Sequence, residues 1–191
     1  MEREVMLAGI GGQGVQLAAA LLARAATLEG RHVLSLGTYG GTMRGGNTES
    51  VVVVGDAPLH SPPIVSRVWS ALVVHPRFWA PVRAKLAAGS LVWTDPTRFD
   101  EALPEGVQKF EVPAAQLASD CGAPVAAALV LVAAFCGGTG LVGLDALCEA
   151  LAACLPPYRQ EHLPKNTEAL RAGFAAAPAA APPAWPAQAV A

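Results

Sequence analysis

The sequence has little charge and few aromatic side chains for its 191 residues. Charged residues make up 15% and aromatic residues 6%, whereas hydrophobic residues make up 53%, with alanine supplying much of that share. The formal net charge is -2, so the basic surplus typical of nucleic-acid-binding proteins is absent. Two explanations of the low charge remain open: an alanine-rich globular core, or an apolar surface that partner subunits cover.

The sequence also lacks the cysteine and histidine spacings of a metal centre. No two of its cysteines form a Cys-x-x-Cys pair, and no histidines lie beside them at ligand spacing. We therefore expect no zinc or iron–sulfur site built from this chain alone, and no hydrolytic Ser/His/Asp or Cys/His set stands out. Small buried hydrophobic side chains are the better interpretation of these thiols. The cysteines are Cys121, Cys136, Cys148 and Cys154.

No stretch of the sequence has the character of a signal peptide or a membrane span. Charged residues open the chain and a strand-like run follows them directly, which favours a reducing cytoplasm. The uncharged region between Asp120 and Asp145 is long enough to cross a bilayer, but Pro124 near its start and four glycines in its second half interrupt it. Its continuous apolar part, Val125–Cys136, is too short to cross, so we expect a buried helix.

Strands and helices alternate along the first part of the chain. This pattern predicts an α/β single domain with an open, mostly parallel sheet, flanking helices, a Rossmann-like opening and a helical C-terminal part. Strands are expected at Val5–Ala8, Arg31–Leu36, Ser50–Val54, Ala71–His75, Leu91–Thr94 and Val107–Val112. Helices are expected at Val15–Glu29, Trp79–Ala88, Ala114–Ser119, Val125–Cys136, Leu144–Cys154 and Thr167–Phe174.

The domain is expected to cover residues 1–174, with an Ala/Pro-rich tail over residues 175–191. The prolines at 178, 182, 183 and 186 exclude a continuous helix in this tail. Its composition favours a solvated segment. The alternative is a segment that lies along a surface, with Trp185 as the anchor on a partner subunit.

A glycine motif follows the first expected strand: Gly9-Ile10-Gly11-Gly12-Gln13-Gly14. Gly9, Gly11 and Gly14 have the spacing of a dinucleotide-binding loop, in which glycines let backbone N–H groups approach an anion at a helix N-terminus. An NAD site should also have an acid at the end of the second strand, but that strand ends Ser35-Leu36-Gly37-Thr38. The motif alone is equally consistent with a tight turn that packs the helix closely on the sheet.

A second glycine-rich segment spans residues 37–47 and contains five glycines around a single cation, Arg44. Arg44 could bind a phosphate or carboxylate with two parallel hydrogen bonds. The alternative is a salt bridge to a nearby acid such as Glu49. Chemistry alone slightly favours the salt bridge.

Together these segments resemble the gamma subunit of the pyruvate/2-oxoacid:ferredoxin oxidoreductase family. In that family a loop of type GxGGQGV is followed by one of type YGxxxRGG, and the terminal helix has the spacing found here at Asn166, Ala169 and Gly173. The two loop motifs correspond to Gly9, Gly11, Gly12, Gln13, Gly14 and Val15, and to Tyr39, Gly40, Arg44, Gly45 and Gly46. The sequence departs from the family pattern at Met43 and at 74–79.

The resemblance implies a non-catalytic small subunit of a complex that oxidatively decarboxylates a 2-oxoacid to an acyl-CoA. The indolepyruvate branch, which acts on an aryl 2-oxoacid, is the most similar in appearance. Larger catalytic subunits are expected to carry thiamine diphosphate, Mg and [4Fe–4S] clusters, with coenzyme A at an interface. This chain alone is expected to bind no cofactor, to be inactive when isolated, and to contact neither nucleic acid nor membrane.

The same resemblance implies no catalytic residue in this chain. It implies binding or interface roles for Gly11, Gly12, Gln13, Gly14, Tyr39, Arg44, Gly45 and Gly46. Two alternatives remain: an independent Rossmann-type nucleotide-binding oxidoreductase, which the missing acid disfavours, and a scaffold whose glycine loops bind only protein.

Overall fold

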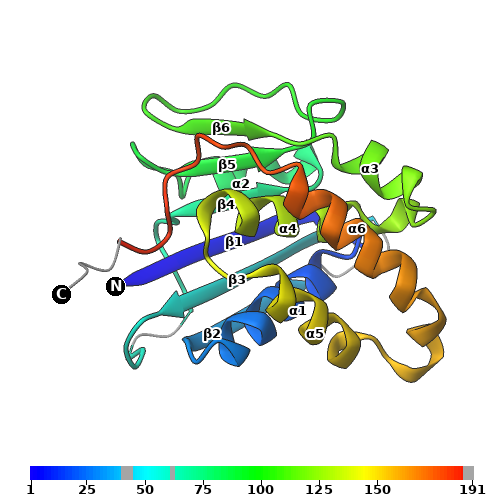
Figure 1. The fold of residues 1–191 in the computed structure, drawn as a ribbon. Helices are drawn as coiled ribbons and strands as arrows, with labels where there is room; N and C mark the ends of the chain where they lie inside the picture. Colours follow the sequence, from blue (N-terminus) through cyan, green and yellow to red (C-terminus); the bar gives the residue numbers. More distant parts are fainter. Residues whose placement is uncertain (40–44, 61–62, 187–191) are drawn as a thin grey trace.

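A six-stranded sheet forms the centre of the computed structural model, which describes residues 1–39, 45–60 and 63–186 (Figure 1). The strand order is β2-β3-β1-β4-β5-β6. β1, β4, β5 and β6 run parallel to one another, and β3 runs antiparallel to both β1 and β2. The predicted fold class is therefore confirmed. The strands are β1 (Glu2–Ile10), β2 (His32–Tyr39), β3 (Asn47–Gly55), β4 (Ser70–Val73), β5 (Leu91–Thr94) and β6 (Gln108–Glu111).

The placement of β2 differs from what a simple strand–helix–strand unit would give. β1 and β2 point the same way, as expected, but β3 lies between them and pairs with both. The reason lies in the sequence of β3, where Val51–Val54 is a continuous apolar run that is buried on both faces. Such a run is stable only in the interior of a sheet. β2, whose residues Ser35 to Thr38 are exposed, is left at the edge.

Helices cover the two faces of the sheet unequally. Alternate residues of β1 belong to different cores: Val5 and Leu7 face α1, α4 and α5, whereas Met6 and Ala8 face α2. Figure 1 shows α1, α3, α4, α5 and α6 on one face of the sheet and α2 on the other. The helices are α1 (Val15–Leu28), α2 (Trp79–Arg83), α3 (Ala114–Asp120), α4 (Ala127–Thr139), α5 (Leu144–Cys154) and α6 (Leu163–Ala175). Short 3-10 helices, η1 (Pro76–Phe78), η2 (Pro124–Ala126) and η3 (Pro157–His162), precede α2, α4 and α6.

Helix α2 ends earlier than the expected Trp79–Ala88 helix. After Arg83 the chain turns toward β5, and the Ser90 hydroxyl holds the turn by accepting from the Ala87 N–H at 3.1 Å and donating to the Val68 carbonyl at 2.7 Å. The buried Ser90 hydroxyl therefore makes two hydrogen bonds. Tertiary hydrogen bonds of this kind override local helix propensity.

The apolar stretch at Val125–Cys136 forms a buried helix, as predicted, with its first turn as the 3-10 helix η2. Nine consecutive residues of α4, Ala128 to Cys136, are buried. Across the part of the chain that the structure describes, no helix is both long enough and apolar enough to cross a membrane.

The cysteines are free thiols, and Cys136 in α4 is fully buried. Burial raises the pKa of the Cys136 thiol far above its usual range, because the apolar surroundings disfavour the thiolate. The described residues contain no group of three or more His, Cys, Asp or Glu side chains placed to hold a metal ion.

The C-terminal segment up to Pro186 packs on the domain itself. Ala184 is buried, its N–H donates to the Thr139 carbonyl at 2.7 Å, and its carbonyl accepts from the Arg3 Nε at 2.6 Å. The Trp185 indole N–H donates to the Leu141 carbonyl at 3.1 Å, and the Arg31 guanidinium lies 4.0 Å from its ring centre. Trp185 thus anchors this segment to a surface, as the second alternative proposed. The surface belongs to its own chain and not to a partner subunit.

Helices α4 and α6 approach each other at Gly173. A Cβ added there would lie 2.9 Å from the Val130 Cα and closer still to the Val130 carbonyl oxygen. Neither atom can move away, because Val130 is fully buried in the middle of α4. The contact between the two helices therefore depends on the absence of a side chain at this position.

We predict that Gly173→Ala lowers the free energy of unfolding by about 3 kcal/mol, because the added methyl group must push two backbones apart. Glu168→Ala, at an exposed position of the same helix, is the control and should change it by less than about 0.5 kcal/mol. Chemical denaturation followed by tryptophan fluorescence measures both. Equal losses in the two variants would show that the helices are not in backbone contact.

Candidate functional site

The glycine loop between β1 and α1 makes a tight turn that only glycine accommodates. Gly12 and Gly14 have φ values of 100° and 75°, in the left-handed region that L side chains avoid. Gly14 is also the N-cap of α1, and no side chain caps this helix. The first N–H groups of α1 therefore lack a capping side chain.

The two glycine-rich segments of the sequence meet in space. The Gly11 N–H donates to the Gly46 carbonyl at 2.9 Å, and the Gly45 N–H donates to the Gly11 carbonyl at 3.3 Å. Gln13 folds back on its own loop, where its side-chain carbonyl accepts from the Ile10 N–H at 3.3 Å. Its role in the described loop is thus to stabilise the turn.

The glycine loop lies at the carboxyl end of β1, beside the carboxyl end of the neighbouring parallel strand β4. β1 continues into the glycine loop and α1 on one face, and β4 continues into η1 and α2 on the other face. In open α/β sheets this change of face marks the crevice where ligands bind. The turn after β4 reaches the same place, since Arg77 Nη1 lies 3.5 Å from the Gly45 carbonyl oxygen.

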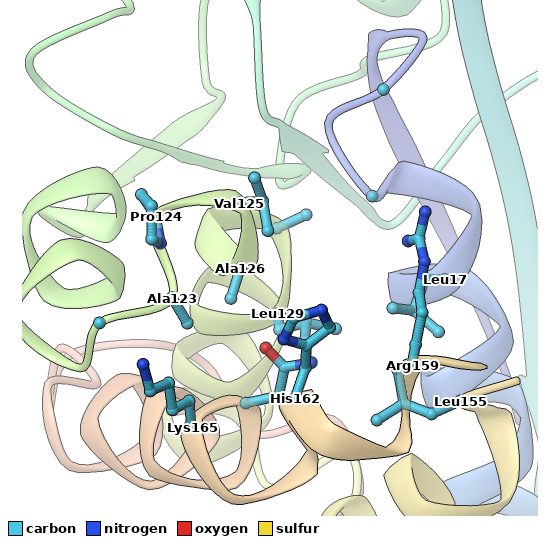
Figure 2. A pocket seen from close by; sticks show the side chains of 15 residues that line it. Leu17, Ala123, Pro124, Val125, Ala126, Leu129, Leu155, Arg159, His162 and Lys165 are labelled. Atoms are coloured by element: carbon cyan, nitrogen blue, oxygen red, sulfur yellow. The ribbon is translucent and has the colours of Figure 1, made fainter. Parts of the chain in front are cut away.

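A cavity of about 220 Å³ opens beside the glycine loop on the side that carries α4 and α6. It lies where three chain segments converge: the loop and start of α1, the turn and η2 that lead into α4, and η3 with the start of α6. Figure 2 shows the side chains that line it. The lining residues are Gly12, Gly14, Leu17, Gly122, Ala123, Pro124, Val125, Ala126, Ala128, Leu129, Leu155, Arg159, His162, Lys165 and Asn166.

The cavity has a positive character. Arg159, His162 and Lys165 line it, and none of the described lining residues is acidic. In Figure 2 the His162 and Lys165 side chains rise from η3 and α6 toward the segment Ala123–Leu129, whereas Arg159 extends from η3 alongside Leu17 of α1. No ion pair joins Arg159 or Lys165 to an acid among the described residues, whereas His162 Nε2 lies 3.7 Å from the carboxylate of the adjacent Glu161.

Helix ends add to this positive character. The start of α1 contributes Gly14 to the wall, the start of α4 contributes Ala126 and Ala128, and neither helix has a side-chain cap or an acid in its first turn. The partial positive charge of both helix N-termini is thus left uncompensated. Asn166, which is 7% exposed, places a neutral amide in the same wall. The arrangement can bind an anion, and phosphate is the form that helix N-termini and arginine accommodate best.

A second, smaller hollow of about 140 Å³ lies on the other side of the loop, between Ile10 and Thr48. Gln16 forms part of its wall and links α1 to β3, because its amide donates to the Glu49 carbonyl at 3.1 Å and accepts from the Ser50 hydroxyl at 2.9 Å. This hollow contains no charged lining residue in the described chain. It is therefore the poorer candidate for an anion.

A family model described as pyruvate ferredoxin/flavodoxin oxidoreductase matches residues 4–176. The chain belongs to this family. The resemblance inferred from the two glycine motifs is thereby confirmed.

Two curated relatives match almost end to end. The 2-oxoglutarate synthase subunit KorC of Methanothermobacter thermautotrophicus is 31% identical over 91% of this chain and 94% of its own length. KorC of Methanothermobacter marburgensis is 29% identical over 91% and 95%. The ketoisovalerate oxidoreductase subunit VorA of the same organism is 31% identical over 75% of this chain, but only 30% of its own length is matched.

Solved structures share the fold. The gamma subunit of a keto/oxoacid ferredoxin oxidoreductase from Geobacter sulfurreducens is 25% identical with a TM-score of 0.76, over 92% of this chain and 98% of the other. The 2-oxoglutarate:ferredoxin oxidoreductase of Magnetococcus marinus, solved with 2-oxoglutarate, coenzyme A and succinyl-CoA bound, gives a TM-score of 0.83 at 22% identity. The match covers 95% of this oxidoreductase-family chain and 32% of the Magnetococcus chain.

The structure brings together part of the predicted site of this family member. Gly11, Gly12, Gln13 and Gly14 form the loop, and Gly45 and Gly46 contact it. Tyr39 ends β2, opposite Thr48, while Arg44 and Gly40 lie outside the described residues. The carboxylate of Glu49, once considered as a partner for Arg44, accepts from the Asn47 amide at 2.7 Å.

The sequence motifs did not point to the basic side chains of the cavity. Arg159, His162 and Lys165 are more than 140 residues from the glycine loop in the chain, and their spacing on η3 and α6 matches no motif. One signal was available: Asn166 was noted for its place in the family's terminal helix, and it lines the same cavity.

Gly14 and Gly30 provide a matched pair, since their φ values are 75° and 76°. We predict that Gly14→Ala and Gly30→Ala each lower the free energy of unfolding by about 1–2 kcal/mol, because both force a left-handed conformation on alanine. Only Gly14→Ala should also weaken binding of inorganic pyrophosphate, since Gly30 follows the opposite end of α1 and does not line the cavity. Calorimetric titration distinguishes them, and equal weakening would place the anion elsewhere.

Proposed function

We propose that this chain is the gamma-type small subunit of a 2-oxoacid:ferredoxin oxidoreductase complex of the 2-oxoglutarate type. The observation that carries the proposal is its near end-to-end match to KorC subunits of 2-oxoglutarate synthase, at up to 31% identity. The cavity beside the glycine loop supports a binding role within that complex. The indolepyruvate branch, expected from the appearance of the motifs, gains no support from these relatives.

We infer a division of labour in which partner subunits perform the redox chemistry. Thiamine diphosphate with Mg and the [4Fe–4S] clusters are assigned to larger subunits, since the described residues offer no set of ligands for a metal. Coenzyme A, when bound, supplies the thiol that receives the acyl group. The residues of this chain would bind and orient the phosphorylated part of that molecule and would not take part in bond making.

The cavity residues fit this task. Arg159 can donate two parallel hydrogen bonds to a phosphate, and Lys165 adds a compact charge. The Lys165 ammonium is held near Gly122, where an added Cβ would lie 3.4 Å from Nζ. The uncapped starts of α1 and α4 supply further N–H donors. A phosphate in this position would lie near four sources of positive potential, which are Arg159, Lys165 and the starts of α1 and α4. None of the described lining residues is an acid that would repel it.

An independent Rossmann-type enzyme is a weaker interpretation. Such an enzyme places β2 next to β1, so that an acid at the end of β2 reaches the ribose beside the glycine loop. Here β3 separates the two strands, and β2 carries no acid from His32 to Tyr39. A scaffold that binds only protein leaves the acid-free cavity unexplained.

The subunit role predicts a strict dependence of activity on this chain. Larger subunits expressed without it should lose coenzyme-A-dependent reduction of ferredoxin in the presence of 2-oxoglutarate, and adding the chain should restore it. The isolated chain should be colourless, silent in the assay and prone to self-association. A chain that purifies as a well-behaved monomer, copurifies with no larger subunit and has no effect on activity would contradict the role.

Lys165→Glu tests the cavity in the assembled complex. Removing one cation and adding an anion should weaken coenzyme A binding by about tenfold to a hundredfold, because a charge-assisted hydrogen bond contributes roughly 1.5–3 kcal/mol. 2-Oxoacid decarboxylation measured without coenzyme A should be nearly unchanged. The matched control is Arg83→Glu on α2, which makes the same change of charge at an exposed position of the opposite face.

Equal effects of Lys165→Glu and Arg83→Glu would show that only the overall charge of the chain matters, and would contradict a phosphate site. The proposed role of Arg44 is tested in the same assay. Arg44→Ala should act on the coenzyme A step alone if Arg44 borders the coenzyme A path. Equal losses in 2-oxoacid decarboxylation without coenzyme A and in the coenzyme-A-dependent step would indicate an interface salt bridge instead.

A further inference from the structure

The last described segment, residues 177–186, follows α6 and contains no helix or strand. We call this segment the strap. The family model that matches the chain ends at residue 176, so the strap lies outside the matched region. In Figure 1 it is the red trace that runs from the end of α6 toward the start of β1. Only Ala184 among its residues is buried, so a small number of contacts holds the strap in place.

Two consecutive glycines near the end of α4 form a notch for the first half of the strap. A Cβ added at Gly137 would lie 3.0 Å from the Ala177 Cβ, and one added at Gly138 would lie 3.2 Å from the Ala181 Cβ. The Pro178 carbonyl oxygen would also be 3.2 Å from the Cβ at Gly138. These separations are shorter than an ordinary van der Waals contact. The strap therefore reaches the backbone of α4 because neither glycine has a side chain.

An aromatic ring forms the floor of this notch. A Cβ added at Gly138 would lie 2.7 Å from Cη2 of Trp93 in β5. The Trp93 ring packs edge-on against Phe135 of α4, with ring centres 5.6 Å apart. Shallow grooves with an aromatic floor are the sites at which proline-rich segments dock in other proteins.

The second half of the strap is held by polar contacts beyond the notch. The Ala184 N–H donates to the carbonyl of Thr139, one of the last α4 carbonyls, which have no partner inside the helix. The Trp185 indole N–H donates to the Leu141 carbonyl, and the Arg31 guanidinium lies 4.0 Å from the centre of the indole ring. The groove thus offers acceptors for one backbone and one indole N–H, and a cation for an aromatic ring.

We propose that this groove is a binding site for an extended, proline-rich peptide with a tryptophan anchor, and that the strap of the same chain occupies it. The strap presents alanine, a backbone N–H and tryptophan in the order in which the groove presents the notch, the α4 carbonyl and Arg31. Its prolines restrict the free strap to extended conformations, which lowers the entropy lost on binding. They are Pro178, Pro182, Pro183 and Pro186.

Attachment to α6 gives the strap an advantage over a free peptide. A segment on a short linker has an effective concentration on the order of millimolar, so a free peptide at about micromolar concentration does not displace it. Weakening the strap at its tryptophan reduces this advantage and leaves the groove complete. Binding of a free peptide is therefore expected when the strap has lost its own anchor.

The test uses full-length chain with Trp185→Ala and a labelled peptide that has the sequence of residues 177–186. The variant should bind this peptide about tenfold more tightly than wild type, since its own strap has lost the indole hydrogen bond and the Arg31 contact. Fluorescence anisotropy measures both affinities. The same peptide with alanine in place of its tryptophan should not bind the variant measurably. Adding Arg31→Ala to the variant should weaken binding of the tryptophan peptide by about threefold, because its ring then lacks the cation.

Tyr158→Ala is the matched control, because it removes an aromatic side chain that is 76% exposed and lies outside the strap. Its affinity for the peptide should equal that of wild type. The proposal is overturned by equal affinities of wild type and Trp185→Ala, by equal binding of the two peptides, or by no binding to the variant. Where Trp185→Ala fails to fold, Arg31→Ala alone provides the measurement. Hydrogen exchange at the Ala184 amide should then be about threefold faster than in wild type, and unchanged exchange overturns the proposal.

Discussion

The close contact of α4 and α6 at Val130 and Gly173 determines the geometry on which the candidate site depends. α4 is buried along its length, so its position over the sheet is fixed by apolar packing. α6 can cross it closely only because Gly173 has no side chain. That crossing places the start of α6, with Lys165 and Asn166, opposite the start of α4, and the cavity is the space left between them.

The unliganded fold carries a small electrostatic penalty at this site. Arg159 and Lys165 face the same space as the uncapped starts of α1 and α4, with no described acid to offset them. Because Arg159 and Lys165 are exposed, water screens the repulsion among these charges, and both electrostatic penalties to the unliganded fold are small. An anion that binds only the folded state would remove both penalties and stabilise the protein by mass action.

Patterns within short windows were enough to predict most of the fold. The Gly9–Gly14 motif identified the loop, its glycines and the helix after it, and the apolar run at Val125–Cys136 identified α4. The apolar run Val51–Val54 favours an interior position for β3, but its place between β1 and β2 also depends on pairing with β1, which is distant in the chain. The cavity could not be predicted for a related reason. Its cations lie on α6 and η3, and they meet the glycine loop only through helix packing.

The closure of the chain between Arg3 and Ala184 has a topological consequence. The first strand and the last described segment are joined by a 2.6 Å hydrogen bond, and Ala184 is buried between Thr139 and β1. A domain whose entry and exit points touch can be carried inside a longer polypeptide without disturbing its core. The same fold makes up 32% of the Magnetococcus marinus chain, where it is one part of a larger enzyme. The fold is thus found both as nearly a whole chain, in the Geobacter sulfurreducens gamma subunit, and as about a third of a longer one.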